Sequence, residues 1–360
     1  MALSDPQPSS GPRHGTHGRY QDGRRVPDFF VVGHAKTGTT ALHEMLRLHP
    51  GVFLPDLKEP MFLASDMPLR HRVPVAGLPA SIDAYLDLFQ AATPSQMAGE
   101  ISPLYLLSAT AASNIASINP DARMVAIFRE PAAFLRSFHL EAVQVGNEDQ
   151  RNLRHALALE DRRRSGADIP RGCFRPGLLL YSDHVRYAAQ LGRFRSCFPA
   201  EQILVLIYED LLQDNPGTIR RILGFLGLDE QWSAPEVRAN PTVAVRSRVL
   251  AGTTARLAGG NGPFWSGLKR GMKALLPATL RQHLLNDIAP KLAYSKPPPH
   301  DEELMAELRQ RFRPEVEALS VMIGRDLAEL WGYRPAGAAP PPPPAPSVAR
   351  PAAGDPTTPA

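Results

Sequence analysis

One loop near the start of the apolar part of the chain carries residues suited to binding a phosphate-like anion. The run from Gly33 to Thr40, GHAKTGTT, follows a short apolar stretch and precedes a helical pattern. Its glycines permit close backbone approach, and the N-terminus of the following helix favours negative charge. We therefore expect the anion to be bound by the lysine, the second glycine and the threonines: Lys36, Thr37, Gly38, Thr39 and Thr40.

The spacing separates this loop from that of magnesium-dependent nucleotidases. A Walker-type loop reads G-x-x-x-x-G-K-[ST], whereas here Thr39 follows the second glycine and the lysine is Lys36. Such enzymes also use an Asp at the end of a neighbouring strand to hold Mg²⁺, but the apolar run 123–128 ends in Arg129. A cation there favours a second phosphate, so we expect a metal-free site for a nucleotide with phosphate at both ends of its ribose. A P-loop kinase or NTPase is the alternative.

The elements that must position these residues follow an α/β pattern. Apolar runs that read as buried strands are each followed by turn residues or a helical pattern, as in parallel sheets with crossover helices. The predicted strands are 28–32, 97–101, 123–128 and 203–207. The predicted helices follow the loop, start at Pro131, and cover 215–228 and most of 302–331, with Pro314 as a break or a new first turn. The fold class is thus α/β, with a P-loop-like central parallel sheet and helices on both faces.

Composition sets the boundaries and excludes several functional classes. Residues 1–26 read as a disordered arm, 27–334 as one domain, and 335–360 as a disordered Pro/Ala-rich tail. A formal net charge of +4 argues against a general nucleic-acid binder. No signal-like or transmembrane apolar run occurs, and two cysteines form no disulfide framework, so we expect a cytoplasmic protein. The excess of arginine over lysine, with abundant alanine and proline, favours a bacterial source.

Two segments together resemble one known family. PDFFVVGHAKTGTTAL (27–42) resembles the 5′-phosphosulfate loop of sulfotransferases that use 3′-phosphoadenosine 5′-phosphosulfate (PAPS). VAIFREPAAFLRSF (125–138) resembles their 3′-phosphate segment, and KEPMFL (58–63) with GEISPLYL (99–106) resembles segments of bacterial and heparan-sulfate-type members. The resemblance extends over about residues 27–332.

The resemblance implies an enzyme that moves the sulfuryl group of PAPS to an acceptor hydroxyl by in-line transfer and releases PAP. The acceptor would be a carbohydrate, a lipid or another small molecule such as a natural product. By this resemblance Lys36 stabilises the leaving phosphate and Glu100 accepts the proton, Arg129 and Ser137 bind the 3′-phosphate, and Tyr208 touches the nucleotide.

The residues leave some alternatives open. Histidine is the base in other branches of the family, so His34, His43 and His139 compete with Glu100, while Glu59 reads as a structural ion-pair partner. A non-catalytic PAP- or PAPS-binding protein of the same fold is a further alternative, because donor motifs report binding more than turnover. Arg246 and Arg248 could close over the nucleotide, but solvated arginines are the simpler interpretation.

Overall fold

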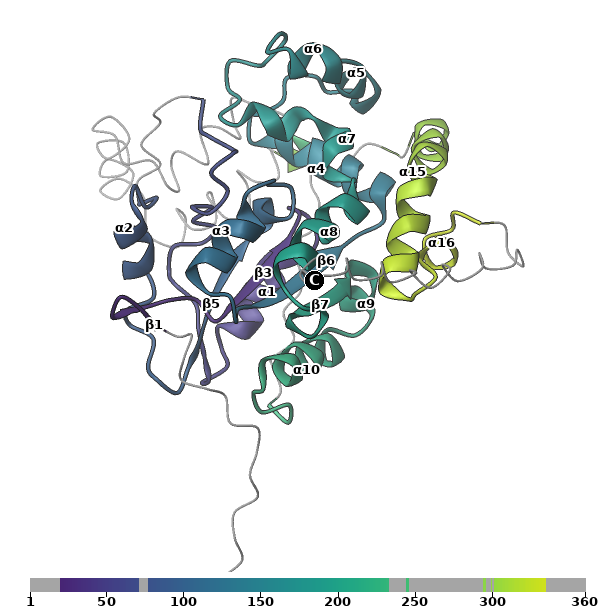
Figure 1. Cartoon of the computed structure of the whole chain (residues 1–360). Coiled ribbons are helices and arrows are strands. Elements are labelled where there is room, and N and C mark those ends of the chain that lie inside the picture. The colour runs from purple at the N-terminus through teal and green to yellow at the C-terminus, as the bar shows by residue number, and fades with distance from the viewer. Residues whose placement is uncertain are drawn as a thin grey trace, which may run out of the picture.

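The centre of the molecule is a sheet of parallel strands. The computed structural model describes residues 20–70, 77–232, 244–245, 294–295, 299 and 301–334. The five strands lie in the order β4 (Val52–Phe53), β5 (Met97–Ser102), β3 (Phe29–Gly33), β6 (Arg123–Phe128), β7 (Ile203–Ile207), all paired in parallel (Figure 1). This order confirms the expected P-loop-like α/β sheet. Four of the strands match the sequence prediction within one residue at each end, and β4 was not predicted.

Helices cover both faces of this sheet. They are α1 (Thr39–Leu46), α2 (Ile82–Asp87), α3 (Ala111–Ile118), α4 (Pro131–Gln144), α5 (Leu153–Ala158), α6 (Glu160–Arg164), α7 (Tyr181–His184), α8 (Tyr187–Cys197), α9 (Tyr208–Gln213), α10 (Asn215–Leu226), α15 (Glu302–Ile323) and α16 (Leu327–Leu330). Short 3-10 turns occupy Pro103–Tyr105, Pro176–Leu179 and Ala200–Gln202. No helix in the described part of the chain is long and apolar enough to span a bilayer.

Side chains that alternate along each strand divide the core into two layers. On β3, Phe29 and Val31 pack with the apolar faces of α1 and α10, while Phe30 and Val32 face the layer that contains α3, α4, α8 and α15. Both sets are fully buried, which explains why the strands appear as unbroken apolar runs in the sequence. The sheet is therefore held rigidly between helices, with its strand ends free to carry the site.

Because the strands are parallel, the segments that follow them all lie at the same edge of the sheet. β3 runs into α1, β6 into α4, and β7 directly into α9. Helix α4 begins at Pro131, as predicted, and the Glu130 carboxylate caps it by accepting hydrogen bonds from the N–H groups of Ala132 and Ala133 at 3.0 and 2.6 Å. This cap fixes the turn that contains Arg129.

The first described residues differ from the expected disordered arm. Within 20–26, β1 (Tyr20–Gln21) pairs antiparallel with β2 (Arg24–Arg25). The Arg25 guanidinium is buried, donates to an Asp28 carboxylate oxygen at 3.0 Å and to the Gln96 carbonyl at 2.9 Å, and so ties this hairpin to the sheet. The arm prediction fails here because composition does not reveal a buried ion pair. Residues 1–19 and the predicted tail 335–360 lie outside the described residues.

Helix α15 passes through Pro314 without the predicted break. The proline removes one backbone hydrogen bond, to the carbonyl of Gln310, but both residues are exposed and water can replace that bond. Leu308, Phe312 and Val316 are buried on either side of Pro314 and hold both halves of the helix to the core. A short antiparallel pair, β8 (Ala244–Val245) with β9 (Tyr294–Ser295), completes the described strands. Arg246 and Arg248 lie outside the described residues.

A buried ion pair joins the segment of α5 and α6 to the rest of the domain. Arg163 donates two hydrogen bonds to Glu148, at 2.7 and 2.8 Å, and neither side chain is exposed to solvent. Tyr181 donates a further hydrogen bond to Glu148 at 2.9 Å. Burial opposes ionisation of the Glu148 carboxyl, but hydrogen bonds, first of all from Arg163, outweigh it and lower its pKa. The pair therefore stays charged at neutral pH.

We predict that Glu148→Gln lowers the free energy of unfolding by about 3 kcal/mol, because Arg163 would keep a buried charge without a counter-charge. The pKa of Glu148 is lowered by folding, so its contribution is present at neutral pH and is lost on acidification through that lowered pKa. Urea denaturation at pH 7 and at pH 3 measures both effects. The control is Glu307→Gln, which breaks the exposed Arg154–Glu307 pair and should leave stability unchanged. Equal stability of the two variants would contradict the prediction.

Candidate active site

The loop between β3 and α1 has the backbone geometry of an anion cradle. Gly38 precedes the first residue of α1 with φ 88°, and Lys36 also has a positive φ of 67°. The hydroxyl of buried Thr37 donates to the His34 carbonyl at 2.7 Å, so Thr37 closes the loop on itself. No side chain caps α1, so its first N–H groups are available to bind an anion.

A hollow of about 170 Å³ opens beside this loop. The residues that line it come from the turns after β3 and β6, the start of α9, the segment after β4, and α4. The lining residues are Ala35, Lys36, Gly38, Thr39, Thr40, Ala41, Glu59, Arg129, Glu141 and Tyr208. Six of the residues predicted from the sequence thus meet here: Lys36, Gly38, Thr39, Thr40, Arg129 and Tyr208. Thr37, Glu100 and Ser137 do not line it, and Ser137 is buried on α4.

Arg129 is fixed between two of these turns. Its Nη1 donates to the Lys36 carbonyl oxygen at 2.8 Å, and its guanidinium carbon lies 4.5 Å from the centroid of the Tyr208 ring. Cation–π contact and a hydrogen bond together orient the planar guanidinium. The hydroxyl of Tyr187 donates a hydrogen bond to the Arg129 carbonyl oxygen at 2.9 Å. The cation that replaces the Mg²⁺-binding aspartate of nucleotidases is therefore preoriented at the edge of the hollow.

Two carboxylates share the hollow with Lys36. The Lys36 Nζ lies 4.0 Å from a Glu141 carboxylate oxygen, and burial raises the pKa of Glu141. Burial, and next the charge of Glu141, also raises the pKa of Glu59. A carboxylate with a raised pKa beside a cationic anion site is suited to accept a proton at neutral pH. The sequence suggested a structural ion pair for Glu59 without a named partner; its neighbour Lys58 pairs with Glu44.

The turn that carries Glu59 is strained. Glu59 and Met61, on either side of Pro60, have φ values of 51° and 52°, a region that residues other than glycine rarely adopt. Strain of this kind persists where surrounding contacts enforce it, often at functional sites. Because β4 is only two residues long, its hydropathy pattern does not indicate that this turn follows a strand of the sheet. Glu59 was therefore named from the sequence but given a structural role.

Glu100 lies beneath this turn in a buried hydrogen-bond network. Ser102 donates to its carboxylate at 2.6 Å, and Tyr85 donates a second hydrogen bond. Burial raises the pKa of Glu100 to about 7, although these hydrogen bonds act in the opposite direction. The Ser102 hydroxyl in turn accepts a hydrogen bond from the Met61 N–H at 3.2 Å. Glu100 thus supports, through Ser102, the turn that presents Glu59.

The three histidines considered as bases lie outside the hollow. His34 is buried and shares a hydrogen bond with Gln190 at 2.9 Å, and burial lowers its pKa to about 3. Burial also lowers the pKa of His43 and of His139, and the His139 ring contacts the Gln150 carbonyl at 2.8 Å. Among the described residues, no group of three or more His, Cys, Asp or Glu is arranged to hold a metal ion.

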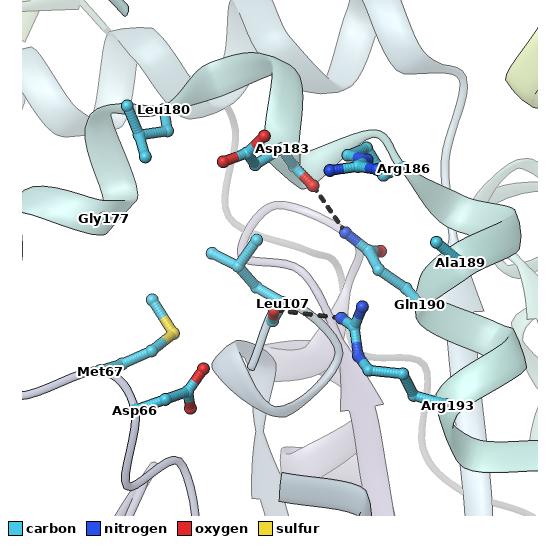
Figure 2. A pocket seen from close by; sticks show the side chains of 10 residues that line it. All are labelled: Asp66, Met67, Leu107, Gly177, Leu180, Asp183, Arg186, Ala189, Gln190 and Arg193. Atoms are coloured by element: carbon cyan, nitrogen blue, oxygen red, sulfur yellow. Dashed lines mark hydrogen bonds between the residues drawn. The ribbon is translucent and has the colours of Figure 1, made fainter. Parts of the chain in front are cut away.

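A second hollow, of about 310 Å³, lies between α7, α8 and the segments around Asp66 and Leu107 (Figure 2). Two of its polar side chains bind backbone carbonyls: Arg193 donates to the Leu107 carbonyl at 3.1 Å, and Gln190 donates to the Asp183 carbonyl at 2.9 Å. Gln190 also contacts His34 in the turn after β3. This hollow shares no lining residue with the first. The hydrogen bond between Gln190 and His34 connects its lining to the loop after β3.

Comparison with known proteins gives a consistent result. The model of the sulfotransferase family matches residues 27–234. Heparan sulfate glucosamine 3-O-sulfotransferase 6 from Homo sapiens is 29% identical over 209 residues, which cover 57% of this chain and 53% of that protein. Bifunctional heparan sulfate N-deacetylase/N-sulfotransferase 4 from Mus musculus is 27% identical over 225 residues, covering 59% and 23%. The chain spans about half or less of the length of these relatives.

One solved structure shares the fold over most of the chain. A sulfotransferase from Alicyclobacillus acidocaldarius superposes with a TM-score of 0.60 at 23% identity, and the match covers 85% of this chain and 99% of that one. At this identity the likeness concerns the fold. It agrees with the parallel sheet described above.

We predict that Gly38→Ala destabilises the protein more than Gly166→Ala. The two glycines have similar φ values, 88° and 86°, so each substitution should cost about 1 kcal/mol or more of backbone strain. A Cβ at Gly38 would also lie 2.6 Å from the Leu211 side chain, whereas a Cβ at Gly166 meets nothing within 4 Å. Urea denaturation compares the two variants. An equal loss of unfolding free energy in the two variants would show that the close approach of Gly38 to α9 does not contribute to stability.

Proposed function

The chain belongs to the sulfotransferase family, and from that premise we propose that it is an enzyme that transfers the sulfuryl group of PAPS to an acceptor hydroxyl. The observation that carries the proposal is the meeting of Lys36 and Arg129 in one hollow at the strand ends. A nucleotide with anionic groups on both sides of its ribose needs two such cationic positions.

The described residues fit the donor. Lys36 and the N–H groups at the start of α1 would bind the 5′-phosphosulfate, with Thr39 and Thr40 as hydroxyl donors. Arg129 would bind the 3′-phosphate with its remaining N–H groups, while Tyr208 stacks against the guanidinium. Ser137 stays in the proposal as a second 3′-phosphate ligand.

The donor supplies an electrophilic sulfur with a phosphate leaving group. In the transfer, the acceptor oxygen forms a bond to sulfur as the bond from sulfur to the 5′-phosphate oxygen breaks. The Lys36 ammonium stabilises the negative charge that develops on that leaving oxygen. The hydroxyl proton must leave as well, so a general base is required on the acceptor side.

We propose that Glu59 is the base that accepts this proton, and we keep Glu100 as the competing candidate. Glu59 lines the hollow with Lys36, and its raised pKa suits a base that works near neutral pH. Glu100 has a pKa of about 7, but its carboxylate already accepts hydrogen bonds from Ser102 and Tyr85. In this assignment Glu100 orders the turn at Met61, and Glu59 contacts the acceptor.

A glycan hydroxyl is the acceptor that we propose first. The curated relatives are named for heparan sulfate, a polysaccharide, and their matches cover 57% and 59% of this chain. We also propose a bacterial source, from the arginine-rich composition, and a cytoplasmic location. Both Cys173 and Cys197 are free thiols, which suits a reducing compartment.

The first test is calorimetric titration with PAP, and with ATP in the presence and absence of Mg²⁺. We expect metal-independent PAP binding that weakens at least 10-fold in Arg129→Ala, because a charge-assisted contact to the 3′-phosphate contributes roughly 1.5–3 kcal/mol. The control is Arg313→Ala, which removes an exposed arginine paired only along α15. Magnesium-dependent ATP binding with no response to PAP would favour a P-loop kinase instead.

The second test compares Glu59→Gln with Glu100→Gln in a sulfuryl-transfer assay with PAPS. We expect Glu59→Gln to lower turnover by roughly 100-fold or more and to retain PAP affinity, because proton transfer contributes about that factor. The base must be ionised, so wild-type turnover should rise with pH through the raised pKa of Glu59, and this limb should vanish in Glu59→Gln. Loss of the limb in Glu100→Gln alone would assign the base to Glu100. PAP binding without turnover on any acceptor would favour a non-catalytic protein.

A further inference from the structure

The residues next to Arg129 and Tyr208 point away from the hollow and toward the C-terminal helices. Arg129 and Tyr208 are the first residues after β6 and β7, and Glu130 and Glu209 follow them. The two turns are joined to each other, because the Glu130 N–H donates to Glu209 Oε1 at 3.3 Å. Each turn therefore presents one residue to the ligand and a carboxylate to the other side.

The C-terminal segment supplies a donor to each of these carboxylates. Trp331 Nε1 donates to Glu209 Oε2 at 2.9 Å, and the Tyr333 hydroxyl donates to Glu130 Oε1 at 2.6 Å. Both aromatic side chains are buried, at 6% and 7% exposure. The Tyr333–Glu130 hydrogen bond is buried, and the Trp331–Glu209 hydrogen bond is partly buried. Each one is a link from the end of the chain to a nucleotide-site turn.

A third contact holds the same segment against α9. Arg325 forms a two-pronged ion pair with Asp210, the residue after Glu209, with one contact at 2.8 Å. Helices α15 and α16 lie along one side of the domain, where α15 packs against α4 and α8 (Figure 1, yellow). The segment from Arg325 to Tyr333 thus makes three successive contacts with the residues after β7 and β6. Arg325 binds Asp210, Trp331 binds Glu209, and Tyr333 binds Glu130.

These donors also matter electrostatically. Glu130 and Glu209 follow Arg129 and Tyr208 in the chain, and the Arg309 Nε is 4.0 Å from Glu130. The Glu209 carboxylate accepts from Trp331 and from the Glu130 N–H, so loss of the Trp331 donor would leave it freer to turn toward Arg129 and compete with the phosphate for it. The Glu130 carboxylate also caps α4, and Tyr333 adds a third donor that holds it in that direction. Directed away and hydrogen-bonded, they leave the Arg129 side chain to its contacts with Lys36 and Tyr208.

We propose that Trp331 and Tyr333 are positioning residues of the nucleotide site, which keep Glu209 and Glu130 directed away from Arg129 so that it can bind the 3′-phosphate. The inference rests on the proposed function. It extends the donor site to a segment outside the 27–234 range that the family model matches. Neither residue touches the ligand, so both act through the turns after β6 and β7.

The test is the affinity of Trp331→Phe and Tyr333→Phe for PAP and for AMP, which lacks the 3′-phosphate. Tyr333→Phe keeps the ring and removes only the hydroxyl donor. Trp331→Phe removes the indole N–H together with part of a buried aromatic side chain, so the comparison with AMP is needed to separate a positioning effect from a loss of packing. We expect the Kd for PAP to rise roughly 5-fold in each variant, the size of a coupling of about 1 kcal/mol, while the Kd for AMP stays unchanged. Isothermal titration calorimetry on the full chain measures both ligands.

The matched control is Tyr181→Phe. It removes a buried tyrosine hydroxyl that donates to a carboxylate, Glu148, at 2.9 Å, but this carboxylate does not neighbour a nucleotide-site turn. It should lower the melting temperature as Tyr333→Phe does and leave the PAP affinity unchanged.

Three outcomes overturn the inference. A wild-type Kd for PAP in both variants would contradict the inference. An equal rise in the Kd for PAP and for AMP would show a general loss of structure. Weaker PAP binding in Tyr181→Phe would have the same meaning. A wild-type protein that does not bind PAP contradicts the proposed function itself, and this result is distinct because it appears before any variant is compared.

Discussion

The Arg129 guanidinium holds together three parts of the chain that meet at the edge of the sheet. It contacts the loop after β3 through the Lys36 carbonyl, stacks on Tyr208 after β7, and itself follows β6. Parallel strands bring their carboxyl ends to one edge, so a cation there can join turns that are far apart in sequence. The shape of the hollow depends on this contact, because two of its walls are the turns that Arg129 connects.

Around that cation the molecule controls where negative charge lies. Glu59 and Glu141 share the hollow with Lys36, and burial raises the pKa of both carboxyls. Glu130 and Glu209 instead face the C-terminal segment and accept hydrogen bonds from it. The carboxylates near this anion site are thus of two kinds: two that share the hollow and have a raised pKa, and two that are directed elsewhere by hydrogen bonds. The proposed transfer would use both arrangements, because it needs a base beside a phosphate ligand.

The donor half of the site was predictable from sequence for a definite reason. Lys36, Gly38 and Thr39 are adjacent, and their geometry follows from a strand, a turn and a helix that are also adjacent. Arg129 could be placed because the buried strand 123–128 ends there and charge at such a position needs a partner. The acceptor half depended on β4, which is two residues long and leaves no hydropathy pattern. Glu59 was therefore given a structural role, and the family resemblance favoured Glu100, which lies on the predicted strand 97–101.

The sequence by itself determined the local features: the order of strands and helices, the anion loop, the start of α4 at Pro131, and the family resemblance. Each depends on residues that are neighbours in the chain, or on short segments of such neighbours. Tertiary structure decided which side chains share the hollow, the continuity of α15 through Pro314, and the links from Trp331 and Tyr333 to the strand turns. Those outcomes depend on burial and on contacts between distant segments, such as the 203 positions that separate Glu130 from Tyr333. Only packing brings such partners to hydrogen-bond distance.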